Sequence, residues 1–209
     1  MNRVIQVTPD PQSAAASCVR LRQALIPLVD GSIDNPYIVN LESGEYDCGT
    51  STVIVPEGVC LQGMGHWSLT RIIAHVDHES LGAIHLLRGS QLRNVEVINF
   101  SSDSTPENGG IVVSLFDPGS SVDQIEIYGV NLSPAANPPN NYSIEANGAF
   151  LRVVRSQLFN TVHANGSIIG IRDSVIQDTF VEGGSQLRCS FTRFVDGTQA
   201  TQSCQMPPP

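Results

Sequence analysis

Two aspartates near the end of the chain have the spacing of a reacting pair in a repeating fold. Asp178 and Asp196 lie at the same position of consecutive 18-residue segments. Equivalent positions on stacked strands are about 4.8 Å apart, so one carboxyl should have a raised pKa or a cation should lie between them. This predicts an acid/base pair or a calcium site. A ladder of turn residues is the alternative, because Asn99 and Asn160 occupy this position in earlier segments.

Three more residues are candidates for substrate contact. Glu145 and His163 share another position of the repeat, which predicts a carboxylate beside an imidazole and a possible acid/base couple. The next segment has Val181 there, so the couple would not continue. Tyr142 ends the long insert 131–142, and inserts of repeat folds gather on one face, where they can form a wall beside a groove.

Two weaker candidates carry charge. Arg155 and Asp173 share a position on adjacent segments, which predicts a stacked ion pair on the surface, or an arginine base of the kind a lyase uses. His75 and Asp77 would share one face of a strand, with His85 downstream. A solvated loop is favoured over a metal site for this stretch.

An internal repeat positions these residues. Segments of 18 residues begin at Ser143, Thr161 and Thr179. Aligning them gives two apolar columns and one hydroxyl column: Val153, Ile171 and Cys189; Leu158, Ile176 and Phe194; and Ser156, Ser174 and Thr192. Upstream, Leu92 and Val122 are assigned to the first apolar column, and Val97 and Ile127 to the second. So short a period, with apolar residues alternating, predicts an all-β solenoid of short stacked strands.

The ends of the chain lack this period. An amphipathic stretch predicts a helical cap at about 12–31, stacked strands at about 36–197 and an irregular C-terminal cap or tail at 198–209. Together these form one domain, 1–209.

The segment 36–73 resembles the opening of right-handed parallel β-helix proteins of the pectin-lyase-like superfamily. The matching residues are Ser43-Gly44-Glu45-Tyr46, Val59-Cys60-Leu61-Gln62-Gly63-Met64-Gly65 and Thr70-Arg71-Ile72, and the stretch 92–99 resembles the repeating unit of that family. The resemblance covers about residues 15–197. It implies a single-stranded right-handed parallel β-helix with an N-terminal α-helical cap, and it does not select one activity.

A local resemblance to pectin methylesterases lies in Gln177-Asp178-Thr179-Phe180 and Val195-Asp196-Gly197. It implies that Asp178 is the acid/base, Asp196 the nucleophile and Gln177 an oxyanion donor. No segment matches the one that supplies the substrate arginine in that family.

Charge and cysteine content limit the partners and the compartment. A net charge of −9 argues against a nucleic-acid partner, and no stretch approaches the roughly 20 apolar residues of a membrane span. We expect a cytoplasmic or particle-associated protein, or a secreted one if a leader has been removed. Cys48–Cys60 and Cys189–Cys204 can pair in an oxidising setting, or the five cysteines remain buried thiols.

Two functional hypotheses follow. The first is a β-helix that binds or processes carbohydrate, possibly an acidic polysaccharide, as a lyase, esterase or epimerase. The second is a non-catalytic structural or receptor-binding module, as in a phage tail or surface assembly. Aspartates that point into a groove favour the enzyme, whereas aspartates bonded to backbone at a bend favour the module.

Overall fold

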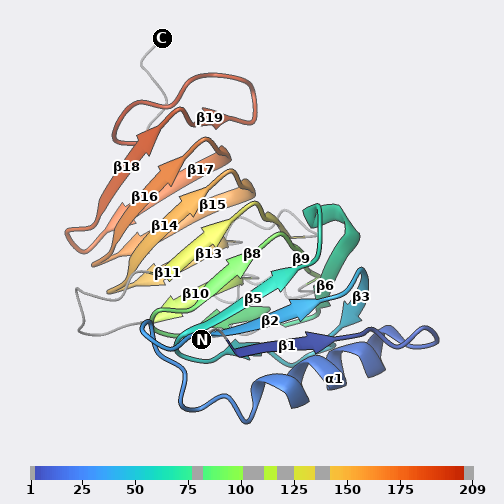
Figure 1. The fold of residues 1–209 in the computed structure, drawn as a ribbon. Coiled ribbons are helices and arrows are strands. Elements are labelled where there is room, and N and C mark those ends of the chain that lie inside the picture. The colour runs from blue at the N-terminus through green and yellow to red at the C-terminus, as the bar shows by residue number, and fades with distance from the viewer. Residues whose placement is uncertain (1–2, 77–81, 101–110, 117–124, 135–141, 205–209) are drawn as a thin grey trace.

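The computed structural model describes residues 3–76, 82–100, 111–116, 125–134 and 142–204. Most of their regular structure is β-strand, arranged in two sheets whose strand pairs are all parallel, and one α-helix packs at the N-terminal end (Figure 1). The side chains of residues 116, 125, 133 and 134 are not part of this description.

The first sheet has eight strands in chain order. They are β1 (Arg3–Val7), β2 (Tyr37–Leu41), β5 (Val59–Gly63), β8 (Gln91–Arg93), β11 (Ile125–Tyr128), β14 (Phe150–Val154), β16 (Ile168–Arg172) and β18 (Gln186–Ser190). Because the strands between them in sequence belong to the second sheet, the chain leaves this sheet and returns to it repeatedly.

The second sheet has two arms that join at the nine-residue strand β15. One arm contains β3 (Gly44–Asp47), β6 (Thr70–Ala74), β9 (Glu96–Asn99) and β12 (Asn131–Pro134). The other contains β4 (Val53–Val55), β7 (Ile84–Leu86), β10 (Ile111–Phe116) and β13 (Tyr142–Asn147). β15 (Gln157–Asn165) extends both arms, followed by β17 (Val175–Glu182) and the short β19 (Arg193–Phe194). We call one passage through the first sheet and both arms a rung.

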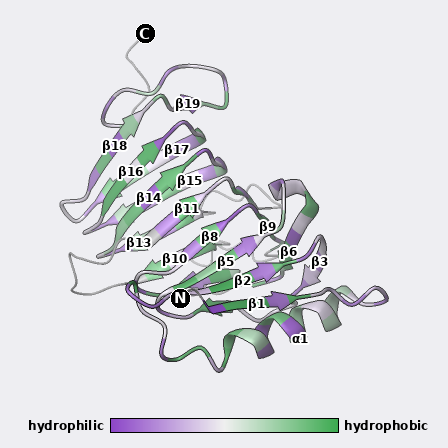
Figure 2. Cartoon of the chain, viewed as in Figure 1, coloured by the Kyte–Doolittle hydropathy of each residue, from purple (hydrophilic) through white to green (hydrophobic). Residues whose placement is uncertain are grey.

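The predicted 18-residue spacing is confirmed by the strand register. In the first sheet Phe150 pairs with Ile168, which pairs with Gln186. Inward residues alternate with outward ones, and Val153, Ile171 and Cys189 form one buried column. Hydrophobic residues recur at matching places on these strands (Figure 2).

One upstream assignment was wrong. Ile127 pairs with Leu92 and with Val153, so it belongs to the first apolar column and not the second. The second column is continued by Leu132, which pairs with Val97. The error arose because 111–134 contains inserts that shift the repeat, and Val122 lies outside the described residues.

The turns between the sheets also repeat. Arg155, Asp173 and Phe191 have φ of 51°, 51° and 52°, in the left-handed region. The residue after each is a buried Ser or Thr, and the Ser174 hydroxyl accepts a hydrogen bond from Ser156 N–H at 3.1 Å. Such bonds satisfy turn amides that the strands cannot pair, so the predicted hydroxyl column connects one rung to the next.

The N-terminal end is covered by helix α1 (Ala14–Leu25), which is shorter than predicted. Ser13 caps it by accepting a hydrogen bond from Ala16 N–H at 3.1 Å. A disulfide joins Cys18 of the helix to Cys48, so the predicted Cys48–Cys60 pair is wrong. Cys60 is a buried free thiol. The edge strand β1 was not predicted, because five residues of mixed burial give little periodic signal.

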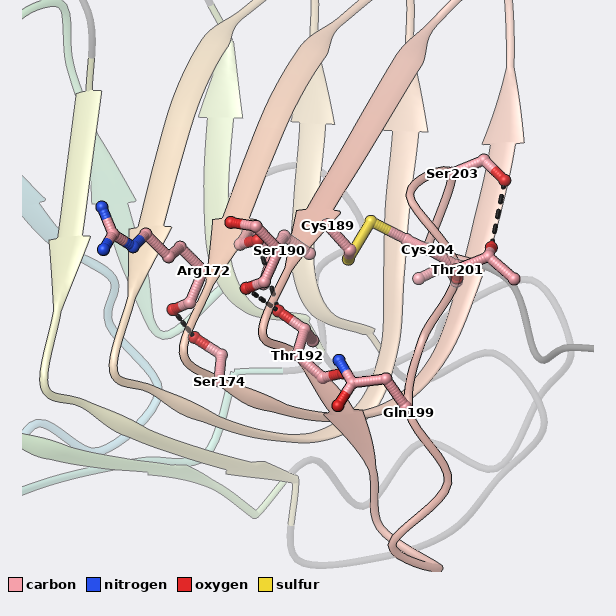
Figure 3. Close-up of a disulfide and its surroundings, with 11 residues drawn as sticks. Arg172, Ser174, Cys189, Ser190, Thr192, Gln199, Thr201, Ser203 and Cys204 are labelled. Atoms are coloured by element: carbon pink, nitrogen blue, oxygen red, sulfur yellow. Dashed lines mark hydrogen bonds between the residues drawn. A yellow bond between two sulfur atoms is a disulfide. The ribbon is translucent and has the colours of Figure 1, made fainter.

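The C-terminal end is closed by the segment 198–204. It folds back over the last rung, where Cys189 N–H donates to the Gln202 carbonyl at 2.8 Å and Gln199 Nε2 donates to the Thr192 carbonyl at 2.7 Å. The disulfide Cys189–Cys204 fixes it there (Figure 3), which confirms that predicted pair.

Candidate functional site

The outward face of β13, β15 and β17 gathers most of the polar candidates. On β15, Val162 and Ala164 point into the core, so His163 between them points outward. Its register neighbours are Glu145 on β13 and Phe180 on β17. The structure thus brings Glu145 and His163 side by side, as the repeat predicts.

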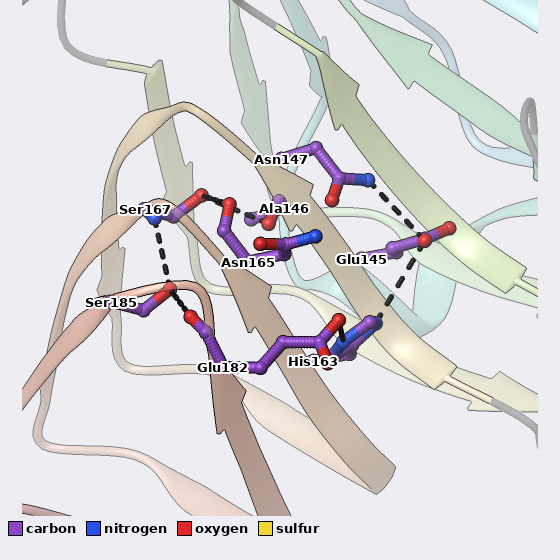
Figure 4. A network of polar contacts seen from close by, with 8 residues as sticks. All are labelled: Glu145, Ala146, Asn147, His163, Asn165, Ser167, Glu182 and Ser185. Carbon is purple, nitrogen blue, oxygen red and sulfur yellow. Dashed lines mark hydrogen bonds and ion pairs between the residues drawn. The ribbon is translucent and has the colours of Figure 1, made fainter.

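His163 lies between two carboxylates (Figure 4). Its Nε2 is 3.0 Å from Oε1 of Glu182, a hydrogen-bond distance, and its Nδ1 is 3.8 Å from Oε1 of Glu145. The His163 side chain is only 10% exposed, whereas the Glu182 side chain is 47% exposed. The carboxylate of Glu182 is therefore the end of this couple that a ligand can reach, and the buried imidazole holds it in place.

Aromatic rings lie on both sides of the imidazole. The ring centroid of Tyr142 is 4.8 Å from that of His163, and the Phe180 centroid is 5.3 Å away on the other side. A register shift between Tyr142 and Ile144 lets Tyr142 pair with Thr161 while Ile144 remains in the core. Tyr142 thus lies beside His163, and its role in substrate contact stays a prediction.

The row of outward polar side chains continues from β13 onto β10 and β7. Ser114 pairs with Glu145, and His85 pairs with Ser114. His85 Nδ1 is 2.9 Å from the Ser114 hydroxyl, and burial lowers the pKa of His85. From the sequence, His85 was grouped only with His75, but its position between the core residues Ile84 and Leu86 turns it outward, into this row.

Asp178 lies on the same face, although not in the predicted column. A register shift in β15 pairs it with Thr161 instead of Asn160, and pairs His163 with Phe180 instead of Val181. Asp178, Phe180 and Glu182 consequently form an outward row on β17, each exposed. Alternate strand residues are about 6.6 Å apart, so the Phe180 ring lies between two carboxylates. We call these three residues the β17 row.

The aspartates make the local bonds of turn residues. Asp178 Oδ1 accepts from Thr179 N–H at 2.8 Å, and Asp196 Oδ1 accepts from Thr198 N–H at 2.8 Å. The second bond lowers the pKa of Asp196, opposite to the raised pKa expected of one member of a carboxylate pair. β17 and β19 are in register only at Val175–Arg193 and Ile176–Phe194, so Asp196 is in the turn beyond.

Arg155 and Gln177 occupy other surroundings. Arg155 Nη1 donates to the Tyr128 hydroxyl at 2.8 Å, and Asp173 pairs with Arg172 at 3.2 Å, so the predicted Arg155–Asp173 ion pair is replaced by these two contacts. Gln177 is exposed on β17. In the described part of the chain, no cluster of three His, Cys, Asp or Glu side chains is arranged to hold a metal ion.

No protein-family model, curated protein or solved structure gives a significant match to this chain. Among the helices that the structure describes, none has the length and apolar character needed to cross a membrane.

Proposed function

We propose that this protein is a right-handed parallel β-helix, similar to those of the pectin-lyase-like superfamily, that binds carbohydrate at the β17 row. The recurring strand order and the wholly parallel register support the fold. A stack of rungs aligns outward side chains on consecutive strands, which suits recognition of an extended chain of similar units.

The observation that carries the proposal is the β17 row itself. Exposed carboxylates accept hydrogen bonds from sugar hydroxyls, and an exposed aromatic ring packs against the C–H face of a sugar ring. Phe180 is 51% exposed although it is a large apolar side chain, and it has a carboxylate on either side. Glu145 adds a third carboxylate behind the row, so neutral sugar units fit here better than acidic ones.

A processing activity would use Glu182. The imidazole of His163 orients this carboxylate and can exchange a proton with it across 3.0 Å. Glu182 would act as the acid/base towards the ligand, with His163 as its positioning residue. The hypothesis of Asp178 and Asp196 as a reacting pair is less well supported, since each is bonded to a nearby backbone amide.

The alternative function is a non-catalytic module. Two disulfides near the two ends stabilise the stack, and the turn-like bonding of both aspartates is what the module hypothesis expects. Because disulfides persist in oxidising surroundings, we further propose that the protein works outside the cytoplasm or on a particle surface.

A glycan array tests the proposal, with the wild type compared against Phe180→Ala. Phe191→Ala is the matched control, because Phe191 is also an exposed phenylalanine, 74% exposed, in a turn of the next rung. We expect neutral glycans to bind the wild type and Phe191→Ala, and binding to weaken about tenfold in Phe180→Ala. Failure of the wild type to bind any glycan on the array would reject the proposal.

Turnover separates the enzyme from the module. Hydrolase, lyase and esterase assays should be run on the wild type and on Glu182→Gln with the glycan that the array identifies. Turnover that Glu182→Gln abolishes while binding persists supports an enzyme. Binding without turnover in the wild type supports the module.

A further inference from the structure

A hollow of about 290 Å³ lies on the outer face of the first sheet, over β14, β16 and β18. Three arginines line it: Arg152, Arg172 and Arg188. Arg152 pairs with Gly170 and Gly170 pairs with Arg188, so a glycine separates two arginines in one outward column. Arg172 is two residues from Gly170 on the same strand and faces the same way, and its neighbour across the sheet is Ser190 (Figure 3).

Gly170 has no side chain to fill the hollow, and neither backbone conformation nor packing requires a glycine at this position. Its φ is not in the left-handed region, and a Cβ built on it would meet no atom within 4 Å. Glycine within a strand is destabilising by about 0.5–1 kcal/mol relative to alanine. A strand glycine that neither turn geometry nor packing explains commonly marks a place where a ligand approaches the backbone.

The acidic side chains near the hollow only partly compensate the arginines. Glu126 is bonded to Arg93 at 2.6 Å and lies 3.7 Å from Arg152, so two guanidinium groups share one carboxylate. Asp173 pairs with Arg172 at 3.2 Å.

Arg188 has a neutral neighbour instead of an acidic one. Its Nη2 lies 3.5 Å from the side-chain oxygen of Gln186, at the limit of a hydrogen bond. The three arginines that line the hollow and Arg93 thus share two carboxylates. The net charge of the protein is −9, and its eleven Lys and Arg side chains are all arginines. The positive charge around this hollow is therefore opposite in sign to the net charge of the whole chain.

We propose that this hollow binds an oxyanion: a sulfate, phosphate or carboxylate group. Guanidinium groups are planar forks that pair with such groups through two parallel hydrogen bonds. The Cα atoms of Arg152 and Arg188 are two strand spacings apart, roughly 10 Å, so both long side chains can converge on an anion above Gly170. The ligand is either a free anion or the charged group of an acidic saccharide. This site is separate from the β17 row and does not depend on its function.

Calorimetric titration with sodium sulfate, against sodium chloride at equal ionic strength, tests the proposal. Arg188→Ala removes one fork, and Gly170→Glu places a carboxylate between the two arginines. Gly170→Ala is the control for loss of glycine. Arg20→Ala is the control for net charge, because it removes an arginine of helix α1 that pairs with Asp10. Circular dichroism establishes that each variant is folded.

We expect sulfate to bind the wild type, Gly170→Ala and Arg20→Ala alike. Affinity should fall about tenfold or more in Arg188→Ala, and binding should be lost in Gly170→Glu. A sulfated oligosaccharide that binds more tightly than free sulfate identifies the saccharide as the source of the anion, and equal affinity identifies a free anion. Sulfate binding is measured with no glycan present, so failure of the β17 row proposal would not affect this result. Sulfate that binds no better than chloride, or binds Arg188→Ala and Gly170→Glu as well as the wild type, would overturn the assignment.

Discussion

Removing the disulfide between Cys189 and Cys204 measures how much the C-terminal segment stabilises the last rungs. The bond closes a loop of sequence separation 15, for which the chain-entropy relation gives about 3 kcal/mol at 25 °C. The disulfide between Cys18 and Cys48 has a separation of 30, and the same relation gives about 3.6 kcal/mol. The double variants Cys189→Ala/Cys204→Ala and Cys18→Ala/Cys48→Ala should therefore lose similar stability, the second slightly more.

Urea unfolding followed by circular dichroism gives these free energies by linear extrapolation. The wild type under reducing conditions should lose about as much as both variants combined, because the two bonds are at opposite ends of the stack. A C-terminal double variant within about 0.5 kcal/mol of the wild type would contradict a stabilising role for this disulfide. It would mean that the hydrogen bonds of residues 198–204 hold the segment in place without the covalent link.

Three further predictions concern single residues. Phe191→Gly should raise the free energy of unfolding by about 0.5 kcal/mol, since Phe191 has φ of 52° and relief of left-handed strain exceeds the entropy cost of glycine; unchanged or lower stability in urea contradicts this. Burial raises the pKa of the Cys60 thiol to about 11, so iodoacetamide at pH 8 should label Cys60 only after unfolding, and rapid labelling of the folded protein would count against it. Burial also raises the pKa of Tyr46, whose hydroxyl donates to the Val7 and Glu42 carbonyls. A raised pKa in the folded state stabilises the protein below the unfolded pKa of about 10 and the contribution is lost at higher pH. Urea midpoints should therefore fall above pH 10 in the wild type and fall less steeply in Tyr46→Phe.

The regular part of the fold could be read from the sequence, because it depends on alternation and on a constant repeat length. Val153, Ile171 and Cys189 were aligned correctly since the segments that carry them have equal lengths. Ile127 was not, because inserts upstream break the constant spacing. The disulfide between Cys18 and Cys48 could not be predicted either, because no local sequence pattern indicates which cysteines come together in the fold.

The candidate site shows a sharper limit of sequence reasoning. Glu145 and His163 were placed together correctly, but the next member was predicted as Val181. The register shift before Thr161 exchanges it for Phe180, and a shift of one residue in a strand changes which face a side chain occupies. That one-residue shift places Asp178, Phe180 and Glu182 beside the outward residues Thr161, His163 and Asn165. No periodic pattern predicts where such a shift occurs.

Carbohydrate binding at the β17 row is tested most directly by the affinity of Phe180→Ala for the neutral glycan that binds the wild type best, measured by calorimetry beside Phe191→Ala. We expect a dissociation constant about tenfold higher for Phe180→Ala and an unchanged one for Phe191→Ala. Equal affinities in all three proteins would show that the β17 row is not the carbohydrate site.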